Sequence, residues 1–180
     1  MDATGFETRH VSRHFVACGS RQGVWSSFPK LTVAADLRSH LWLGAYACLG
    51  PCQDSPQFTP VVTQAARLQP IEQILGDKGY DAEHNHRLCR EQLAIPSTII
   101  AIRRKSKLSR DRSWPTTPYR REMKRRANRE GYGQRWQVES TFSRHKRLFG
   151  SALRARRWPM QAWELSLRVL SHNVRLIAST

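Results

Sequence analysis

The sequence predicts an α/β domain in which helices are layered against a mixed sheet. Short apolar or alternating segments, typical of strands, occur within residues 1–102 and are interleaved with two helical patterns. Residues 119–177 carry helical patterns alone. A chain of 180 residues has the length of one domain with a core of its own. We therefore expect a single domain over residues 1–180, with a basic loop at about 103–118 and a helical part over 119–180.

The strands of this sheet are predicted from apolar patterning. Polar and apolar residues alternate from the start of the chain to about residue 16, and a Gly/Ser-rich loop follows. The segment FPKLTVAADLRSHLWLGAYACLG predicts strands at 30–35 and 41–47 joined by a turn. The second is almost continuously apolar, so we expect it to be buried on both faces. Residues 71–76 and 96–102 predict two more strands.

Helices are predicted where capping residues precede a helical period. Asp54 and Ser55 stand before Pro56, which is typical of a helix N-terminus, and this helix should end before Pro70. Its expected apolar side consists of Phe58, Val61, Val62, Ala65 and Leu68. A second helix is predicted at 82–93. The segment RRKSKLSRDRSWPTTP at 103–118 has no period and predicts a mobile loop, and helices are predicted at 119–130, 132–149 and 159–177.

The charge is unevenly divided along the chain. Thirty Lys and Arg face 14 Asp and Glu, a net charge of +16, and residues 91–180 hold twenty-one of the basic and six of the acidic side chains. Such a field attracts polyanions, and nucleic acid is a better candidate than an anionic membrane surface, because the basic helices also carry acidic residues and lack a continuous apolar face. No apolar run approaches a membrane span and the start of the chain does not resemble a signal peptide, so we expect a cytosolic protein without a membrane partner.

The four cysteines do not form a recognisable metal motif. Cys48 and Cys52 make a C-x3-C pair, but Cys18 and Cys89 are distant in the sequence. Free thiols in a reducing compartment are therefore favoured over a zinc site.

Residues 132–149, YGQRWQVESTFSRHKRLF, predict one amphipathic helix with a charged face. Tyr132, Arg135, Glu139 and Lys146 fall on one side of the helical wheel, next to an apolar stripe. A solvated i,i+4 ion pair between Arg135 and Glu139 is the simpler explanation of this face.

Two aspartates could complete an acidic site with Glu139. Asp77 follows a predicted buried strand, where α/β sheets expose ligand-binding groups, although a turn residue before Gly79 would also be Asp. Asp2 precedes the first alternating segment. Two Asp and one Glu from separate segments can hold two Mg²⁺ ions, which activate a nucleophile and stabilise a leaving oxygen in phosphodiester chemistry.

The pattern Y-x2-R-x3-E-x6-K over residues 132–146 resembles the signature of DDE transposases from bacterial insertion sequences. GDKGYDAEHNH at 76–86 resembles the block around the second Asp of that family, and MDATGFETRH at 1–10 resembles the block around the first. FPKLTVAADLRSH and LGPCQDSPQFTPVV are also similar to transposase sequence, in the same order. The resemblance covers nearly the whole chain.

This resemblance implies a ribonuclease-H-like fold that cleaves DNA strands at transposon ends and transfers them to target DNA, with two Mg²⁺ or Mn²⁺ ions as cofactors. The implied catalytic and metal-binding triad is Asp2, Asp77 and Glu139. The implied contacts to DNA phosphates are Tyr132, Arg135 and Lys146. Two copies on paired ends are the expected assembly, in the bacterial cytosol.

The chain departs from the family at its start. The first strand of the family lies in the middle of the sheet and ends at the first Asp, whereas only Met1 precedes Asp2 here. We therefore expect a nearly missing central strand, an N-terminally truncated domain and weak or absent catalysis. The alternatives are a non-catalytic, basic DNA-binding remnant and a ribonuclease-H-like nuclease that does not transpose.

Overall fold

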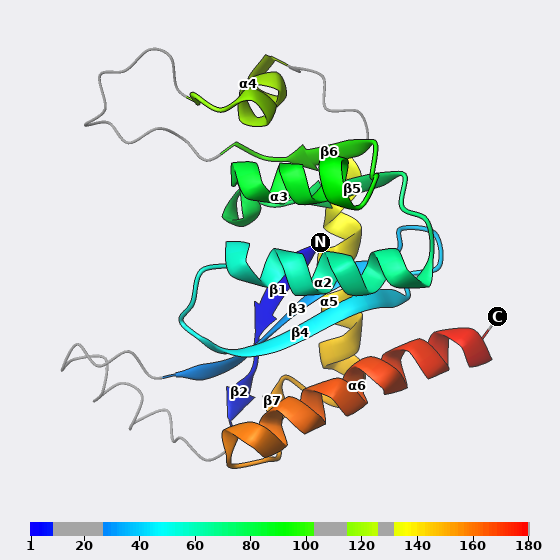
Figure 1. The fold of residues 1–180 in the computed structure, drawn as a ribbon. Coiled ribbons are helices and arrows are strands. Elements are labelled where there is room, and N and C mark those ends of the chain that lie inside the picture. The colour runs from blue at the N-terminus through cyan, green and yellow to red at the C-terminus, as the bar shows by residue number, and fades with distance from the viewer. Residues whose placement is uncertain (9–26, 103–114, 126–131, 180) are drawn as a thin grey trace.

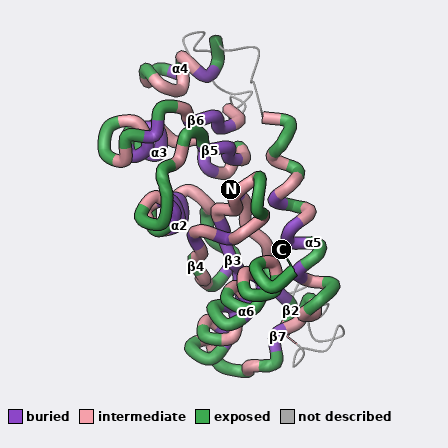
Figure 2. The backbone as a smooth tube through the Cα atoms, turned by 90° about the vertical axis from the view of Figure 1, so that its right-hand side faces the viewer, coloured by how far each residue is buried: buried purple, intermediate pink, exposed green. Residues whose placement is uncertain are grey.

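The computed structural model describes residues 1–8, 27–102, 115–125 and 132–179, and these form a three-layered α/β fold (Figure 1). A sheet lies in the middle, with α2 (Ser55–Leu68) on one side and α5 (Trp136–Phe149) on the other, as Figure 2 shows. The long helix α6 (Trp158–Ala178) packs through Leu165 into the same apolar cluster as Val138 and Phe142 of α5. The predicted layered α/β architecture is thus present.

The central sheet consists of β1 (Asp2–Gly5), β3 (Phe28–Ala35) and β4 (Trp42–Gly50), in the order β1-β3-β4. All neighbours are antiparallel, and Asp2 pairs with Val33. A second, parallel pair consists of β5 (Gln73–Gly76) and β6 (Ser97–Ile100). The ammonium group of Met1 donates a hydrogen bond to the Leu75 carbonyl at 2.7 Å, so the start of β1 links the two pieces of sheet.

Successive side chains of β3 point to opposite faces of the sheet, and an apolar core lies on each face. Leu31 and Val33 point toward α5 and α6, where they join the apolar cluster of Trp42, Phe142 and Leu165 with others. The intervening Thr32 points toward α2 and donates a hydrogen bond to Gln57 at 2.6 Å. The cluster on this second face includes Met1, Phe58, Val61, Tyr80 and Ile100. Helices must therefore cover both faces.

The remaining elements are short. After β5 come a 3₁₀ turn (Lys78–Tyr80), α3 (Glu83–Arg87) and a π-helical turn (Leu88–Gln92), in place of the one helix predicted at 82–93. Helix α4 (Pro118–Arg125) contacts α3. Strands β2 (Glu7–Thr8) and β7 (Ala152–Leu153) form a parallel pair. Residues 103–114 of the predicted mobile loop and residues 126–130 of the predicted helix 119–130 lie outside the described residues.

Several expectations from the sequence are wrong in detail. The first strand is not nearly missing, because Asp2–Gly5 forms a strand along β3 from Asp2 onward. Strand β4 is not buried on both faces along its whole length, since Tyr46 and Leu49 are exposed where the sheet ends. Leu68 lies at the end of α2 and is 69% exposed. The predicted helix 132–149 begins with a separate 3₁₀ turn, Tyr132–Arg135.

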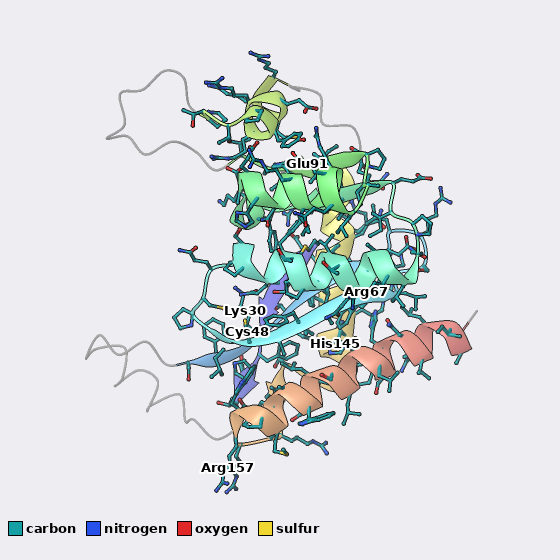
Figure 3. All side chains as sticks on the ribbon, viewed as in Figure 1. Lys30, Cys48, Arg67, Glu91, His145 and Arg157 are labelled. Carbon is teal, nitrogen blue, oxygen red and sulfur yellow. The ribbon has the colours of Figure 1, made fainter. Side chains whose placement is uncertain are left out.

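The described cysteines, Cys48, Cys52 and Cys89, are free, and Cys18 lies outside the described residues. The sulfur atoms of Cys48 and Cys52 lie 3.3 Å apart. Burial, followed by the neighbouring Cys52, raises the pKa of Cys48 to about 12. Lys30 pairs with Cys48 across the strands (Figure 3) and forms an ion pair with Asp54.

Among the described helices, none combines the length and apolar character that a membrane crossing requires.

Close packing of α2 on β4 depends on Gly44. A Cβ atom at this position would lie 2.1 Å from the Val61 carbonyl oxygen, which belongs to the backbone of α2. We expect Gly44→Ala to lower the free energy of unfolding by about 2–3 kcal/mol, because helix and strand must move apart. Urea denaturation measures this loss.

Gly133→Ala is the matched control, because its Cβ would meet nothing within 4 Å. Its unfolding free energy should stay within about 1 kcal/mol of wild type. Equal stability of the two variants would show that α2 does not rest on Gly44.

His145 is buried in an aromatic cluster between α5, β4 and α6 (Figure 3). Its ring centroid lies 4.7 Å from that of Trp42, and neither ring nitrogen has a hydrogen-bond partner among the described residues. Burial lowers the pKa of His145 to about 4, with smaller contributions from the charges of His172, Arg168 and Lys146. The imidazole is therefore neutral in the folded protein at pH 7.

We expect the protein to lose stability as the pH falls from 6.5 to 4. In this interval His145 is protonated in the unfolded chain but stays neutral in the folded chain. His145 therefore contributes a loss of unfolding free energy on the order of 3 kcal/mol at pH 4. His145→Phe keeps the aromatic packing and should flatten this decline, as measured by urea denaturation at each pH. An unchanged decline would show that His145 takes up its proton without leaving the core.

Candidate active site between the first strand and helix α5

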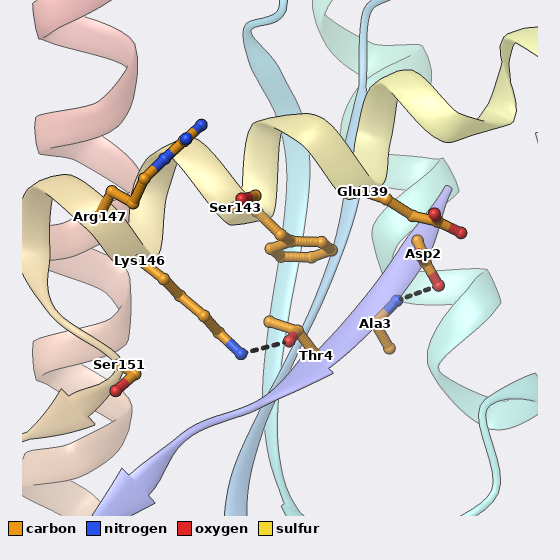
Figure 4. Close-up of a pocket in the computed structure, with 9 residues that line it drawn as sticks. Asp2, Ala3, Thr4, Glu139, Ser143, Lys146, Arg147 and Ser151 are labelled. Atoms are coloured by element: carbon orange, nitrogen blue, oxygen red, sulfur yellow. Dashed lines mark hydrogen bonds between the residues drawn. The ribbon is translucent and has the colours of Figure 1, made fainter.

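Helix α5 crosses directly over β1, and a lysine ties the two together. The Lys146 ammonium donates hydrogen bonds to the Thr4 hydroxyl at 2.7 Å and to the Gly5 carbonyl at 2.9 Å. It also lies 5.2 Å from the centre of the Phe6 ring. Figure 4 shows Lys146 reaching from α5 toward Thr4. These contacts fix the position of α5 along the strand that carries Asp2.

A groove of about 500 Å³ lies between β1 and α5. Figure 4 shows Asp2 and Glu139 together at one end of it and Lys146 and Arg147 toward the other. The groove is lined by Asp2, Ala3, Thr4, Glu139, Phe142, Ser143, Lys146, Arg147 and Ser151. Carboxylates and cations therefore share one surface depression.

Arg135 joins the first and third predicted carboxylates. Its guanidinium lies 2.8 Å from a carboxylate oxygen of Glu139 and 3.8 Å from one of Asp2. The Glu139 side chain is half exposed, whereas those of Asp2 and Arg135 are largely buried. The predicted i,i+4 ion pair is thus present, and Asp2 extends it to a second chain segment.

Asp77 follows β5 directly, as predicted, and its charge acts on the same guanidinium. Although burial acts to lower the pKa of Arg135, the carboxylates of Glu139, Asp77 and Asp2 together raise it. Burial, then Asp54, Asp2 and Asp77, raises the pKa of the Tyr80 phenol. Asp2 and Asp77 therefore lie around the same buried region, at the junction of the two pieces of sheet.

The ionisation of Asp2 is set by its position in the sheet. Burial raises the pKa of Asp2, and Glu139 raises it further. The Ala3 amide, which donates a hydrogen bond to the carboxylate at 2.8 Å, and the Arg135 guanidinium both act against this rise. Burial lowers the pKa of Lys146, against the attraction of Glu7. Asp2 consequently depends on nearby positive charge to remain ionised.

The four residues of the predicted charged face do not stay together. Glu139 and Lys146 line the groove. Arg135 lines a second cavity of about 510 Å³, between Met1 and the ends of β3 and β5. Tyr132 packs against a third apolar cluster that includes Leu75 and Met123. The turn over Tyr132–Arg135 is 3₁₀, so these residues do not follow the α-helical wheel on which the prediction relied.

Other groove residues were not singled out from the sequence. Ser143 and Arg147 follow Glu139 at i+4 and i+8, and both are exposed. Their spacing places them on the same face of an α-helix, so an extended wheel would have included them. Thr4 and Ser151 carry no comparable sequence signal.

The three carboxylates have the chemistry that a hard divalent cation prefers, and they come from three separate elements around one positive charge. As arranged, however, the described part of the chain contains no group of three or more His, Cys, Asp or Glu side chains that could hold a metal ion. Arg135 is paired with two of these carboxylates, Asp2 and Glu139. The donor set therefore fits Mg²⁺ or Mn²⁺ by chemistry, provided that Arg135 moves.

The layered α/β fold thus has acidic side chains where its two pieces of sheet meet, beside a groove that also carries Lys146 and Arg147. The family model described as the transposase DDE domain matches residues 1–174, so the chain belongs to this family. Members typically depend on divalent metal ions, and membership implies that DNA is the partner. No curated protein and no solved structure matches the chain.

We expect Arg135→Gln to raise the pKa of Asp2 further, because the guanidinium is among the groups that lower it. Carboxyl ¹³C NMR through a pH titration measures this change. Arg147→Gln, which removes a cation from the same groove, should leave the pKa of Asp2 as in wild type. Equal effects of the two variants would show that the groove responds to net charge alone.

Proposed function

We propose that this domain cleaves DNA strands at transposon ends and joins them to target DNA, with Asp2, Asp77 and Glu139 as the catalytic triad. The observation that carries the proposal is the pairing of Arg135 with Glu139 of α5 at 2.8 Å and with Asp2 of β1 at 3.8 Å, while the charge of Asp77, at the end of β5, acts on the same guanidinium. Membership of the transposase DDE domain family supports the same reading. The activity belongs in the bacterial cytosol, where the DNA lies.

A ribonuclease-H-like sheet is the fold that this proposal requires. Its support is the order of the strands: β4, β3 and β1 are neighbours, and the Met1 amine places β5 and then β6 beyond β1. In such a sheet Asp2 would begin one central strand and Asp77 would follow the next. In such an α/β arrangement, ligand-binding groups gather where central strands end.

Asp2, Asp77 and Glu139 would hold two Mg²⁺ or Mn²⁺ ions. When bound, the ions lower the pKa of an attacking water or 3′-hydroxyl and stabilise the departing oxygen. Arg135 neutralises the carboxylates in their absence and would then turn toward a DNA phosphate, for which a guanidinium is well suited. The cavity beside Met1, which Arg135 also lines, supports such a movement because it offers space next to the side chain.

The groove cations would position the DNA backbone. Lys146 and Arg147 lie along the groove leading away from Glu139, and Tyr132 lies at the start of the segment that leads into α5. We assign phosphate contacts to Tyr132, Arg135 and Lys146. Phosphate contacts orient a duplex without reading its sequence, so these residues would serve any end sequence. Two copies would act on paired ends.

A non-catalytic DNA-binding remnant is the second candidate. One observation favours it, namely that no metal-binding group is assembled among the described residues. Such a remnant would use the same groove between β1 and α5 but would bind DNA without divalent ions. A ribonuclease-H-like nuclease that does not transpose would share the carboxylates and show cleavage without strand joining.

We expect Glu139→Gln to reduce nicking of supercoiled plasmid DNA in Mg²⁺ or Mn²⁺ by about a hundredfold or more, because it removes a charged metal ligand. DNA affinity, measured by fluorescence anisotropy on a labelled duplex, should remain within about twofold of wild type, since cations carry the binding. Glu72→Gln is the matched control, because Glu72 is exposed at the edge of β5 and outside the groove.

The competing outcomes are distinct. A wild-type chain that binds DNA but does not nick it with either ion would support the remnant. If Glu139→Gln loses affinity as much as nicking, then Glu139 is structural and the triad is wrong.

A further inference from the structure

Helix α6 presents an apolar stripe to solvent. The whole of α6 lies within the described part of the chain, and six of its large apolar side chains are more than half exposed. They are Met160, Trp163, Leu167, Leu170, Val174 and Ile177. The opposite side of the helix is buried against the domain through Gln161, Leu165, Arg168 and His172. This stripe therefore contributes nothing to the core of its own domain.

The stripe has the spacing of a coiled-coil seam. Its six positions follow one another at intervals of three, four, three, four and three residues, which is the a/d pattern of a heptad repeat. A helix that lies on a bilayer or on a broad protein surface has a wider apolar face, with a third apolar position in each heptad, whereas the large exposed side chains here occupy a and d alone. The partner that fits is another α-helix of similar length.

The residues beside the stripe are compatible with burial. Ser166 and Ser171 donate their hydroxyl hydrogens to the carbonyl oxygens of Ala162 and Leu167, so a partner helix would leave neither donor unpaired. Glu164 also lies beside the stripe, and its carboxylate already accepts hydrogen bonds from the Arg154 and Ala155 amides and from Arg168, while Ala178 is small. The flanks thus allow a second helix to approach closely.

The distribution of charge indicates which protein supplies the partner helix. The chain carries +16, yet Arg175 is the single exposed charged residue of α6. A basic protein can pair with its own copy only through a surface with few cations, because like charges oppose association. An acidic partner would instead be recognised by cations along the seam. The uncharged stripe is suited to a second copy of this chain.

We propose that α6 pairs with α6 of a second copy of the chain, antiparallel about a two-fold axis between Leu167 and Leu170. This geometry places Trp163 against Val174 and Met160 against Ile177, so that large side chains meet smaller ones. It moves the two Arg175 side chains apart and opposes the helix dipoles. The six side chains expose roughly 700 Å² per copy, near the ~800 Å² that each partner contributes to a standard interface.

This pairing deepens the proposed function, since paired transposon ends need two copies, and it rests on that function only for its biological purpose. No residue of the stripe lines the groove between β1 and α5. Association can therefore be tested without DNA or metal ions, and its outcome is separate from that of the nicking assay.

Sedimentation equilibrium of the full chain at several concentrations tests the proposal. The wild-type chain should sediment at twice its mass of 20.8 kDa, with a dissociation constant at or below about 10 µM. Leu167→Glu combined with Leu170→Glu should sediment as a monomer with an unchanged circular dichroism spectrum, since both side chains are exposed. Leu68→Glu is the matched control, because Leu68 is 69% exposed at the end of α2, and it should remain dimeric.

A wild-type monomer at 100 µM, about tenfold above that constant, or a double variant that remains dimeric, would overturn the pairing. Photocrosslinking from p-benzoylphenylalanine in place of Trp163 tests the orientation. Attachment to the segment around Val174 of the other copy supports the antiparallel arrangement. Attachment around residue 163 would mean a parallel pair and overturn it.

Discussion

The position of β1 is the constraint on which the rest of the structure depends. This four-residue strand is paired with β3 over its length, and the residue before it, Met1, reaches β5 through the hydrogen bond of its amine to Leu75 and through packing near Ile74. Lys146 of α5 donates hydrogen bonds to Thr4 and Gly5 of β1 and so links the helix to the strand. Burial, acting against Asp2, lowers the pKa of the Met1 amine to about 6, so the link to β5 is made by a group that loses its proton readily. The contacts of Met1 therefore set where the start of β1, which carries Asp2, lies relative to the end of β5, which precedes Asp77.

Arg135 balances the charge of this junction. Asp2 is largely buried, and without a nearby cation its carboxylate would be driven toward the neutral form, as the raised pKa shows. Glu139 and Asp77 add negative charge to the same region. The guanidinium can pair with both Asp2 and Glu139 because its donors point in several directions. The acidic site is thus stable in a strongly basic chain before any metal ion or DNA is present.

The basic charge of the chain has more than one role. Arg120 forms two hydrogen bonds of 2.8 Å with Asp81, and Arg90 lies 2.6 Å from Glu122, so these cations hold α4 on α3. Arg168 donates to the Gly150 and Ala152 carbonyls and joins α6 to β7. Lys146 and Arg147, by contrast, lie along the groove. The net charge alone therefore overstates the surface that is free to meet DNA.

The sequence by itself determined the layered α/β class, the strands at β3–β6, the helices α2, α5 and α6, and Asp77 after a buried strand. These follow from period and capping, which are local properties of the chain. Only the tertiary structure decided that β1 continues after Asp2, because strand pairing with β3 is a contact between distant segments. It also decided that Arg135 lies among the carboxylates, that Tyr132 packs in an apolar cluster and that one side of α6 stays exposed. A periodic pattern shows which side of a helix is apolar, but not which neighbour will cover it.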